Sequence, residues 1–460
     1  MSYYNVRDFG ASGNGVTLDT EKIQNSINTC SNSGGGVVLI PPGIYKIGTL
    51  FLKSHVTIEL SNGAILLASR DIKDYTAVKL WDDEKRKPFV NPDLQPYHLI
   101  VASNCKSIEL KGQGKIKAPG DAFWEIPQPP NTWIPAKVPR VSPTICIHHC
   151  FDVKLTNFSI EDSSGWTIEC NSCERVWIQS LRIKNNFWGP NTDGIDIQGC
   201  KDVIISNCNI DCSDDAICLK TLPDSLPNER ITITNCICRT QCVGLKLGCL
   251  EAFKDMKQIV FSNCVIYDCT RGIGVYSLAG GNIENVLFEN ITIYTNPFWE
   301  LNRPIHVDLR ISKQLPQNIP IGSIKNIRFN NIHCKTQGRI LMTARPGAML
   351  KNIFLSNIHI QYDVIDDPYP KGRNARGNQF SNDNPEAREA RAAVVAENIN
   401  NLSIQNLSVE WPENYSGPPF PVVWGKNLKG GFLDNPLANQ SHKNIDKYQL
   451  FESDIKNIRT

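Results

Sequence analysis

The sequence predicts an all-β fold, a right-handed parallel β-helix (solenoid) with a short N-terminal capping helix. The first observation is a strand-like pattern of alternating apolar residues, ending in Asn, that recurs along the chain at regular intervals. The second is that no helical periodicity is evident between the copies, whereas a doubly wound α/β fold needs a helix in each interval. Short strands repeated at a fixed period are typical of a solenoid, in which each coil packs on its neighbours.

The repeated strands place an Asn four positions after their first apolar residue. Copies begin at Val153, Val203, Ile231, Ile259, Val286, Ile327, Ile353 and Leu402, and a further copy at Val176 carries Ser180 in place of Asn. From 176 to 203, 231, 259 and 286 the steps are 27, 28, 28 and 27 residues, whereas the longer step from 286 to 327 predicts an inserted loop. Asn tolerates the left-handed backbone of a sharp turn, so we expect the Asn side chains to stack at one corner and bond one another.

We expect one β-helix domain over residues 1–460. Residues 1–50 are predicted to form the N-terminal cap and first coil, with a helix that Asp19 or Thr20 caps and that ends before Ser33. Residues 366–391 are a polar insertion, either a surface loop or a wall of a substrate groove or an oligomer contact. Residues 412–460 are predicted as a C-terminal tail or cap.

The 17 cysteines follow the register of the repeat. One set stands three residues before a strand start, and it comprises Cys105, Cys150, Cys173 and Cys200. This favours small apolar side chains stacked inside the coils, with disulfides or a metal site as alternatives. No CxxC pair is matched by a second one at the spacing of a zinc finger.

The composition and net charge of the chain limit its state and the kinds of partner to expect. Apolar residues make up 41% and charged residues 20% of the chain, which argues against disorder as the dominant state. The formal net charge of +2 gives no general electrostatic reason to expect nucleic acid or a membrane surface as partner. The N-terminus lacks a basic stretch followed by an apolar one, so we expect a cytoplasmic protein, or a secreted or periplasmic one if a leader has been removed. The oligomeric state is left open.

Two acidic motifs carry the candidate chemistry: NTDGIDI from Asn191 and SDDAICLK from Ser213. Asp193 and Asp214 are 21 residues apart, close to one coil, so Asp193 is expected about 5 Å from the Asp214–Asp215 pair. Crowding three carboxylates should raise the pKa of one of them. A protonated acid beside ionised carboxylates is what glycoside hydrolysis requires. Ordinary turn aspartates and a calcium site are the alternatives.

These motifs, together with SSGWTIE from Ser163, resemble the family 28 glycoside hydrolases, which include polygalacturonases and rhamnogalacturonases. DFGASGNGVTLDT and GGGVVLIPPGIY are similar to the N-terminal part of many bacterial members, so the resemblance covers residues 4–410. It implies hydrolysis of α-linked galacturonate- or rhamnose-containing chains by inversion, without a metal or organic cofactor. It also implies that Asp214 is the general acid and that Asp193 and Asp215 orient and deprotonate the attacking water.

Two departures from the family pattern concern the substrate. CVGLKLG places Val243 where polygalacturonases carry the His of Gly-His-Gly. RGIGVYSLAGG places Gly274 and Tyr276 at the two basic positions of Arg-Ile-Lys, which binds the galacturonate carboxylate in those enzymes. The remaining candidates for substrate binding are Asn191, Lys220, Lys246, Arg271 and Tyr276. Further basic side chains on later coils that could line the same groove are Arg310, Arg339 and Arg345.

We therefore predict a glycosidase that acts on pectic oligosaccharides from one end. Exo action is inferred from the missing leader and from insertions that could block one end of the groove. One alternative is a polysaccharide lyase on the same fold, for which Lys246 or Arg271 would supply the base. The other is a non-catalytic carbohydrate-binding β-helix, although binding alone does not require three aspartates.

Overall fold

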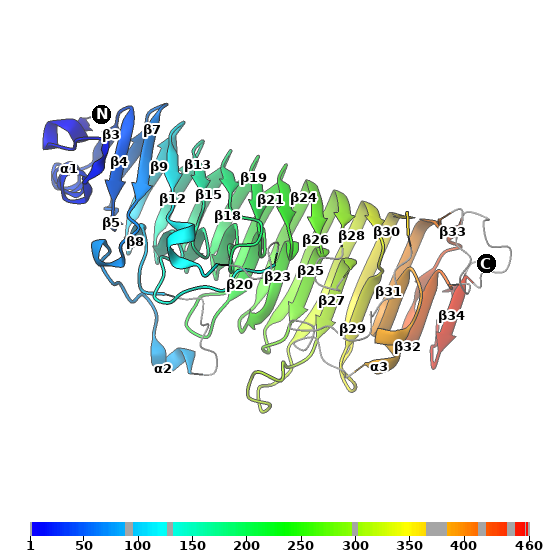
Figure 1. Cartoon of the computed structure of the whole chain (residues 1–460). Coiled ribbons are helices and arrows are strands. Elements are labelled where there is room, and N and C mark those ends of the chain that lie inside the picture. The colour runs from blue at the N-terminus through cyan, green and yellow to red at the C-terminus, as the bar shows by residue number, and fades with distance from the viewer. Residues whose placement is uncertain are drawn as a thin grey trace. The chain divides into compact units, whose positions relative to one another are not determined.

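A computed structural model describes residues 2–87, 95–126, 132–296, 302–364, 384–412, 420–438, 447–455 and 457–458. The chain divides into two compact units: Met1–Leu219 with Pro223–Ile237, and Lys220–Leu222 with Cys238–Thr460. Within each unit, short parallel strands lie side by side in successive coils (Figure 1), so the predicted parallel β-helix is confirmed. That the whole chain is one domain stays a prediction.

The first unit contains the N-terminal helices and the earlier coils. Its helices are η1 (Val6–Phe9), α1 (Thr20–Asn32), η2 (Ile72–Asp74), α2 (Asp83–Arg86) and η3 (Gly120–Phe123). Its strands are β1 (Tyr3–Asn5), β2 (Asn14–Leu18), β3 (Gly36–Ile40), β4 (Gly43–Ile47), β5 (Leu50–Phe51), β6 (Val56–Leu60), β7 (Ala64–Ala68), β8 (Ile100–Ser103), β9 (Lys106–Gly112), β10 (Lys115–Lys117), β11 (Ile145–His148), β12 (Phe151–Thr156), β13 (Ser159–Glu161), β14 (Ile168–Asn171), β15 (Glu174–Gln179), β16 (Arg182–Lys184), β17 (Ile195–Gln198), β18 (Lys201–Ser206), β19 (Asn209–Cys212), β21 (Asn228–Thr234) and the start of β20 (Ile217–Thr221).

The second unit contains longer strands that turn several corners of a coil. They are β23 (Val243–Ala252), β24 (Met256–Cys269), β25 (Arg271–Ser277), β26 (Asn282–Thr295), β27 (Arg303–Leu309), β28 (Ser323–Thr336), β29 (Ile340–Ala344), β30 (Leu350–Tyr362), β31 (Val394–Glu410), β32 (Val423–Leu433), β33 (Leu437–Ala438), β34 (Tyr448–Phe451) and β35 (Asn457–Ile458). β22 (Ile237–Thr240) lies at the unit boundary, and α3 (Pro385–Glu389) precedes β31. Residues 366–383 of the predicted insertion lie outside the described residues.

The repeated motifs pair in the predicted register. In the first unit the strand starts aligned opposite one another are Val153, Val176, Val203 and Ile231. In the second unit they are Ile259, Val286, Ile327, Ile353 and Leu402. Their side chains are buried, and successive coils also stack aromatic rings, with 4.7 Å between the ring centroids of Phe261 and Phe288 and 5.2 Å between those of Phe288 and Phe329. The register therefore extends the hydrophobic core along each unit.

The Asn residues of the repeat occupy left-handed corners, as predicted. The φ angles lie between 50° and 68° for the whole set: Asn157, Asn207, Asn235, Asn263, Asn290, Asn331, Asn357 and Asn406. The side-chain amide of Asn290 donates to Asn263 over 3.1 Å, and that of Asn331 donates to Asn290 over 2.7 Å. Such a ladder satisfies polar groups at a corner where the strands break.

A second ladder, which sequence reasoning did not single out, runs along the opposite end of the same strand motif. Its members stand one residue before the strand start and also have positive φ: Asn285, Asn326, Asn352 and Asn401. The amides of Asn326, Asn352 and Asn401 each donate to the Asn one coil earlier, over 2.9, 2.7 and 2.8 Å. Asn thus marks both corners of these strands.

Cysteines form a third ladder, in the first unit. The main-chain N–H groups of Cys105, Cys150 and Cys173 each donate to the sulfur of the next cysteine, over 3.4, 3.4 and 3.3 Å. The last sulfur belongs to Cys200, whose own N–H donates to the side-chain oxygen of Asn228 over 2.8 Å. All 17 cysteines are buried thiols, which confirms their predicted place in the interior.

The N-terminal helix forms where it was predicted, but its cap differs. Helix α1 buries Ile23, Ile27 and Cys30 against the first coils and lies beside β3 in Figure 1. The carboxylate of Asp19 accepts hydrogen bonds from the N–H groups of Ser12 and Gly13 instead of capping the helix. Asp19 therefore occupies the predicted N-cap position, but its side chain bonds the preceding loop and not the helix N–H groups.

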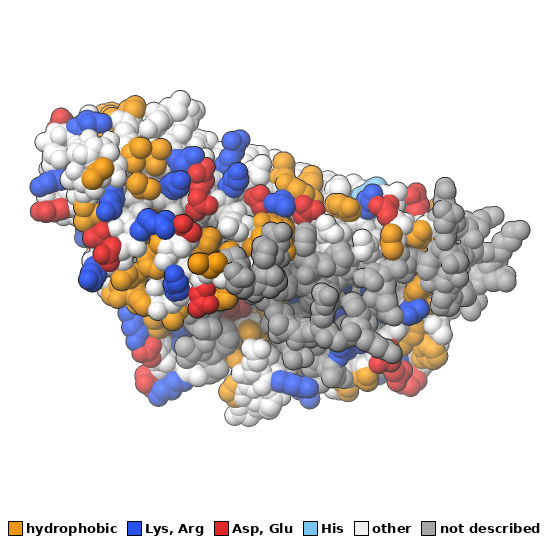
Figure 2. Space-filling view, viewed as in Figure 1, with side chains coloured by type: hydrophobic (Ala, Val, Ile, Leu, Met, Phe, Trp, Pro, Cys, Tyr) orange, Lys and Arg blue, Asp and Glu red, His pale blue; other side chains and the backbone are white. Residues whose placement is uncertain are grey.

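The surface shows no bias to one sign of charge on the face in view. Figure 2 shows basic and acidic side chains intermixed on that face of the first unit. Several exposed ion pairs join adjacent coils, such as Arg175 with Asp152 over 2.7 Å. Among the described residues, no helix combines the length and the apolar composition that crossing a membrane requires.

The first prediction concerns the Asn ladder. Replacing Asn290 by Ala removes two ladder hydrogen bonds, each worth about 1 kcal/mol, and puts an unfavourable residue at φ 54°. We expect the Tm to fall by about 4–8 °C, measured by circular dichroism. Asn290→Gly loses the same bonds but tolerates the backbone, so its Tm should fall less. An Ala variant at least as stable as the Gly variant would contradict the role of the corner.

Candidate active site

The two acidic motifs form the turns that precede β17 and β20, and the structure brings them together on adjacent coils. The N–H of Gly194 donates to the carbonyl of Asp215, and the N–H of Ile195 donates to that of Ala216, both over 2.9 Å. This register places Asp193 and Asp215 at equivalent positions, where parallel strands are about 4.8 Å apart. The juxtaposition agrees with the spacing of the motifs in the sequence.

Gly194 permits this close approach. A Cβ atom at this position would lie 2.4 Å from the carbonyl oxygen of Ala216 and 2.6 Å from a methyl carbon of Ile210. Any side chain would push the two turns apart and misplace the neighbouring carboxylate. The glycine of NTDG therefore has a steric reason in this fold.

The three carboxylates are largely buried. Exposed fractions are 2% for Asp193, 7% for Asp214 and 3% for Asp215. The side-chain amide of Asn191 donates to Oδ2 of Asp214 over 3.2 Å. Next to it, the hydroxyl groups of Thr192 and Ser213 lie 2.8 Å apart and tie the two turns together. Asn191, which the sequence predicted to bind substrate, therefore orients Asp214.

A strip of buried polar side chains continues from this site across the sheet. On β11, β14 and β17, polar residues alternate with Ile and Cys residues that face the coil interior, so the polar ones share the outer face. In register, Cys146 lies opposite Glu169, which lies opposite Asp196. The second row consists of His148, Asn171 and Gln198, and all six side chains are buried.

A segment of the first unit, residues 76–87, covers this strip and is named here the covering segment. The carbonyl oxygen of Leu80 accepts a hydrogen bond from Nδ1 of His148 over 3.2 Å. Nε of Arg86 lies 2.7 Å from both carboxylate oxygens of Asp224, and the two side chains are 4% and 9% exposed. The main-chain N–H of Asp82 also donates to Asp224 over 3.2 Å. A buried ion pair therefore anchors the covering segment.

Burial and charge set the ionisation of the groups beneath the covering segment. Burial by itself raises the pKa of Glu169, but His148, Arg86 and His98 outweigh it and lower the pKa to about 2. Burial lowers the pKa of His98 to about 4. At neutral pH Glu169 is therefore ionised and the neighbouring His98 is neutral.

The other candidates for substrate binding are also buried. Lys246 is 7% exposed, Arg271 is 5% exposed and Tyr276 is fully buried, and all three lie on β23 and β25 of the second unit. Lys246 lies opposite Gly274 in the β23–β25 register. Lys220, on β20, is 2% exposed.

Gly274 and Tyr276, which stand at the altered clamp positions, pack against each other. A Cβ atom on Gly274 would lie 2.4 Å from the ring of Tyr276, so the ring occupies the space of the missing side chain. The same ring contacts His306 edge-on, with 5.0 Å between centroids, and His306 lies opposite Gly274 on β27. The two substitutions are therefore sterically linked.

Two basic residues beside Gly274 and Tyr276 were not predicted from the sequence: Arg303 and His306. Nη1 of Arg303 lies 2.9 Å from Nε2 of His306, and Arg303 is opposite Arg271 in the register. Burial, together with Arg303, Arg271 and neighbouring arginines, lowers the pKa of His306 well below its usual range, so the ring is neutral. The alternation of apolar and polar residues in IHVDLR was the signal that could have found His306.

Comparison with known proteins assigns the family. The model of "Glycosyl hydrolases family 28" matches residues 72–376, and that of "Rhamnogalacturonase A/epimerase, pectate lyase-like" matches residues 3–60. A probable polygalacturonase of Arabidopsis thaliana is 24% identical over 377 residues, which is 77% of each chain.

Solved structures agree in fold. A hyperthermoactive exopolygalacturonase from Thermotoga maritima has a TM-score of 0.64 at 21% identity, over 78% of this chain and 87% of that one. The family 28 exopolygalacturonase of Yersinia enterocolitica has a TM-score of 0.61 at 18% identity, over 99% of this chain and 78% of that one. The match to the family model defines the class of this chain as a glycosidase. The chain belongs to glycosyl hydrolases family 28.

The second prediction concerns Asn191. Its backbone has φ 52°, so Asn191→Gly removes the amide that bonds Asp214 without straining the turn. A hydrogen bond to a charged group is worth about 1.5–3 kcal/mol, so kcat should fall about 10- to 100-fold in a reducing-sugar assay. Asn207→Gly, at φ 56° in the exposed ladder, is the matched control and should keep kcat. Equal activity of the two variants would refute the role of Asn191.

The third prediction concerns the anchor of the covering segment. Arg86→Met keeps most of the side-chain volume but leaves the Asp224 carboxylate without its ion pair, a change that costs about 3–5 kcal/mol for a buried pair. We expect a lower Tm and faster proteolysis within residues 76–87. Adding Asp224→Asn should restore part of the stability, because the amide oxygen can still accept from Asp82. A double variant less stable than Arg86→Met would argue against the pair as anchor.

Proposed function

We propose that this chain is an inverting, exo-acting glycosidase that removes sugars from one end of galacturonate-containing pectic oligosaccharides. The observation that carries the proposal is the register of the acidic turns: Asp193 and Asp215 are equivalent on adjacent coils, and Asn191 holds Asp214 beside them. Membership of family 28 and the similarity to polygalacturonases support the reaction and the substrate class. The cytoplasmic location stays a prediction.

The chemistry divides the carboxylates between two roles. The family resemblance implies that Asp214 protonates the glycosidic oxygen of the leaving sugar. Asp193 and Asp215 then orient and deprotonate a water on the opposite face of the ring, which inverts the anomeric centre.

The covering segment supports exo action. It buries the outer face of β11 and β14 next to the acidic turns and is anchored by the Arg86–Asp224 pair. A polysaccharide lying along the sheet would meet this obstacle on one side of the carboxylates, so only a chain end would fit. Two structures with the same fold belong to exopolygalacturonases.

Within the second unit, basic side chains gather that would bind the carboxylate of an acidic sugar. Arg271 and Arg303 lie opposite one another on the adjacent strands β25 and β27. Lys246 lies one coil earlier, on β23. Guanidinium groups bind carboxylates with two parallel hydrogen bonds, which favours galacturonate over a neutral sugar. These residues would take the place of the altered clamp.

The fourth prediction tests the proposal directly. Galacturonate oligosaccharides of increasing length are incubated with the wild type, Asp214→Asn and Asp255→Asn, an exposed carboxylate that serves as control. The wild type and the control should release single sugars, whereas Asp214→Asn should be about 10²- to 10⁴-fold slower, because it lacks the general acid. Proton NMR of the first product should show the β anomer from an α-linked substrate.

Other products in this assay would indicate a different function. Internal fragments with the same dependence on Asp214 would preserve the chemistry and refute exo action. Release of rhamnose from rhamnogalacturonan oligosaccharides would change the substrate. An unsaturated product, detected by its ultraviolet absorption, would identify a lyase, and binding without cleavage would identify a carbohydrate-binding module.

A further inference from the structure

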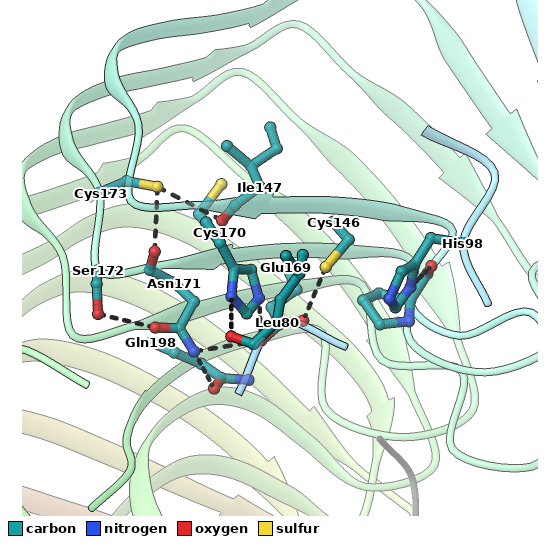
Figure 3. Close-up of polar contacts among 12 residues, drawn as sticks. Leu80, His98, Cys146, Ile147, Glu169, Cys170, Asn171, Ser172, Cys173 and Gln198 are labelled. Carbon is teal, nitrogen blue, oxygen red and sulfur yellow. Dashed lines mark hydrogen bonds and ion pairs between the residues drawn. The ribbon is translucent and has the colours of Figure 1, made fainter. Parts of the chain in front are cut away.

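Three side chains with metal-ligating atoms converge beneath the covering segment. Sγ of Cys146, a ring nitrogen of His148 and a carboxylate oxygen of Glu169 all lie within 4.8 Å of one another. The three residues are 1%, 2% and 1% exposed. Figure 3 shows Cys146 and Glu169 on neighbouring strands with a contact drawn between them, which is 3.5 Å from Sγ to Oε2.

The fold places these atoms together for a simple reason. Cys146 and His148 are two residues apart on β11, so their side chains leave the same face of the strand. Glu169 lies opposite Cys146 in the register with β14. This cysteine differs from those of the cysteine ladder, because it faces the covering segment, whereas Cys170 on β14 faces the coil interior.

The orientation of His148 directs its Nε2 atom into the cluster. A carbonyl oxygen can only accept, so the contact with Leu80 places a proton on Nδ1 and turns Nε2 toward the cluster. Nε2 is buried and lies 3.2 Å from Oε1 of Glu169, the carboxylate of the same cluster. A metal-binding histidine is typically oriented in this way, by a backbone carbonyl on its other nitrogen.

We propose that Cys146, His148 and Glu169 bind a divalent transition metal of the zinc class. Sulfur, imidazole nitrogen and carboxylate oxygen are the three donor types of protein zinc sites. One thiolate and one carboxylate balance the two positive charges of the ion, and the thiol proton leaves to solvent as the metal–sulfur bond forms. Three protein ligands leave a fourth position for water.

The site has a structural role beside the candidate active site. The metal joins β11 to β14, and the hydrogen bond from His148 to Leu80 connects it to the covering segment. Glu169 is also opposite Asp196, which follows Asp193 by three residues. The ion would therefore stiffen the wall next to the acidic turns without contacting substrate.

The test is metal content, which is independent of hydrolytic activity. The full chain is produced in medium with added Zn²⁺ or Co²⁺, and the metal per chain is measured by mass spectrometry. Three variants are compared with the wild type: Cys146→Ala, Glu169→Gln, and Cys170→Ala as a control that removes an equally buried thiol from β14. Circular dichroism establishes that each variant is folded.

We expect about one metal ion per chain in the wild type and in Cys170→Ala, and none in Cys146→Ala. The Co²⁺ form should show a thiolate-to-cobalt charge-transfer band that Cys146→Ala lacks. Glu169→Gln, which keeps the shape of the side chain, should weaken Co²⁺ binding at least about tenfold. Chelation should lower the Tm of the wild type but not that of Cys146→Ala.

A wild-type chain that takes up no stoichiometric Zn²⁺ or Co²⁺ would overturn the proposal. So would a charge-transfer band that persists in Cys146→Ala. If Cys146→Ala does not fold, Glu169→Gln decides: unchanged Co²⁺ affinity in that variant would refute the site, and weakened affinity would support it.

Discussion

The in-register stacking of parallel coils is the constraint on which the rest of this structure depends. Each strand needs a neighbour to pair its main-chain groups and to bury its apolar side chains, and the next coil supplies both. The coils remain aligned because left-handed corners recur at the same point of each turn, with Asn263, Asn290 and Asn331 bonded to one another in sequence. Residues one coil apart in the chain thereby become neighbours in space.

The candidate active site follows from this stacking together with one local exception. Two acidic turns on adjacent coils are brought into contact by the register, and Gly194 lets them approach more closely than any other residue would. Carboxylates that are apart and solvated in an unfolded chain are held close together by main-chain hydrogen bonds between the two turns. The folding energy of the coils therefore offsets the electrostatic repulsion at the site.

Where the repeat is interrupted, the structure acquires features specific to this chain. The covering segment turns an outer sheet face, which is exposed in a simple solenoid, into a buried polar strip that contains an ionised Glu169. In the second unit, Gly274, Tyr276 and His306 pack as one group, so the Tyr276 ring fits only because position 274 has no side chain. Neutral His306 among several arginines keeps that group from adding a further positive charge.

The sequence by itself determined the strands, their register, the corner asparagines and the pairing of the two acidic motifs. These are consequences of a period, and a period is visible in one dimension. It did not reveal the second Asn ladder, the loop contacts that take the Asp19 carboxylate, or the cluster of Cys146, His148 and Glu169. Only the tertiary structure decided these, because they depend on which segment covers a sheet face and on the direction in which a side chain leaves its strand. Contacts such as that of His148 with Leu80 join residues at separations unrelated to the repeat, so no periodicity records them.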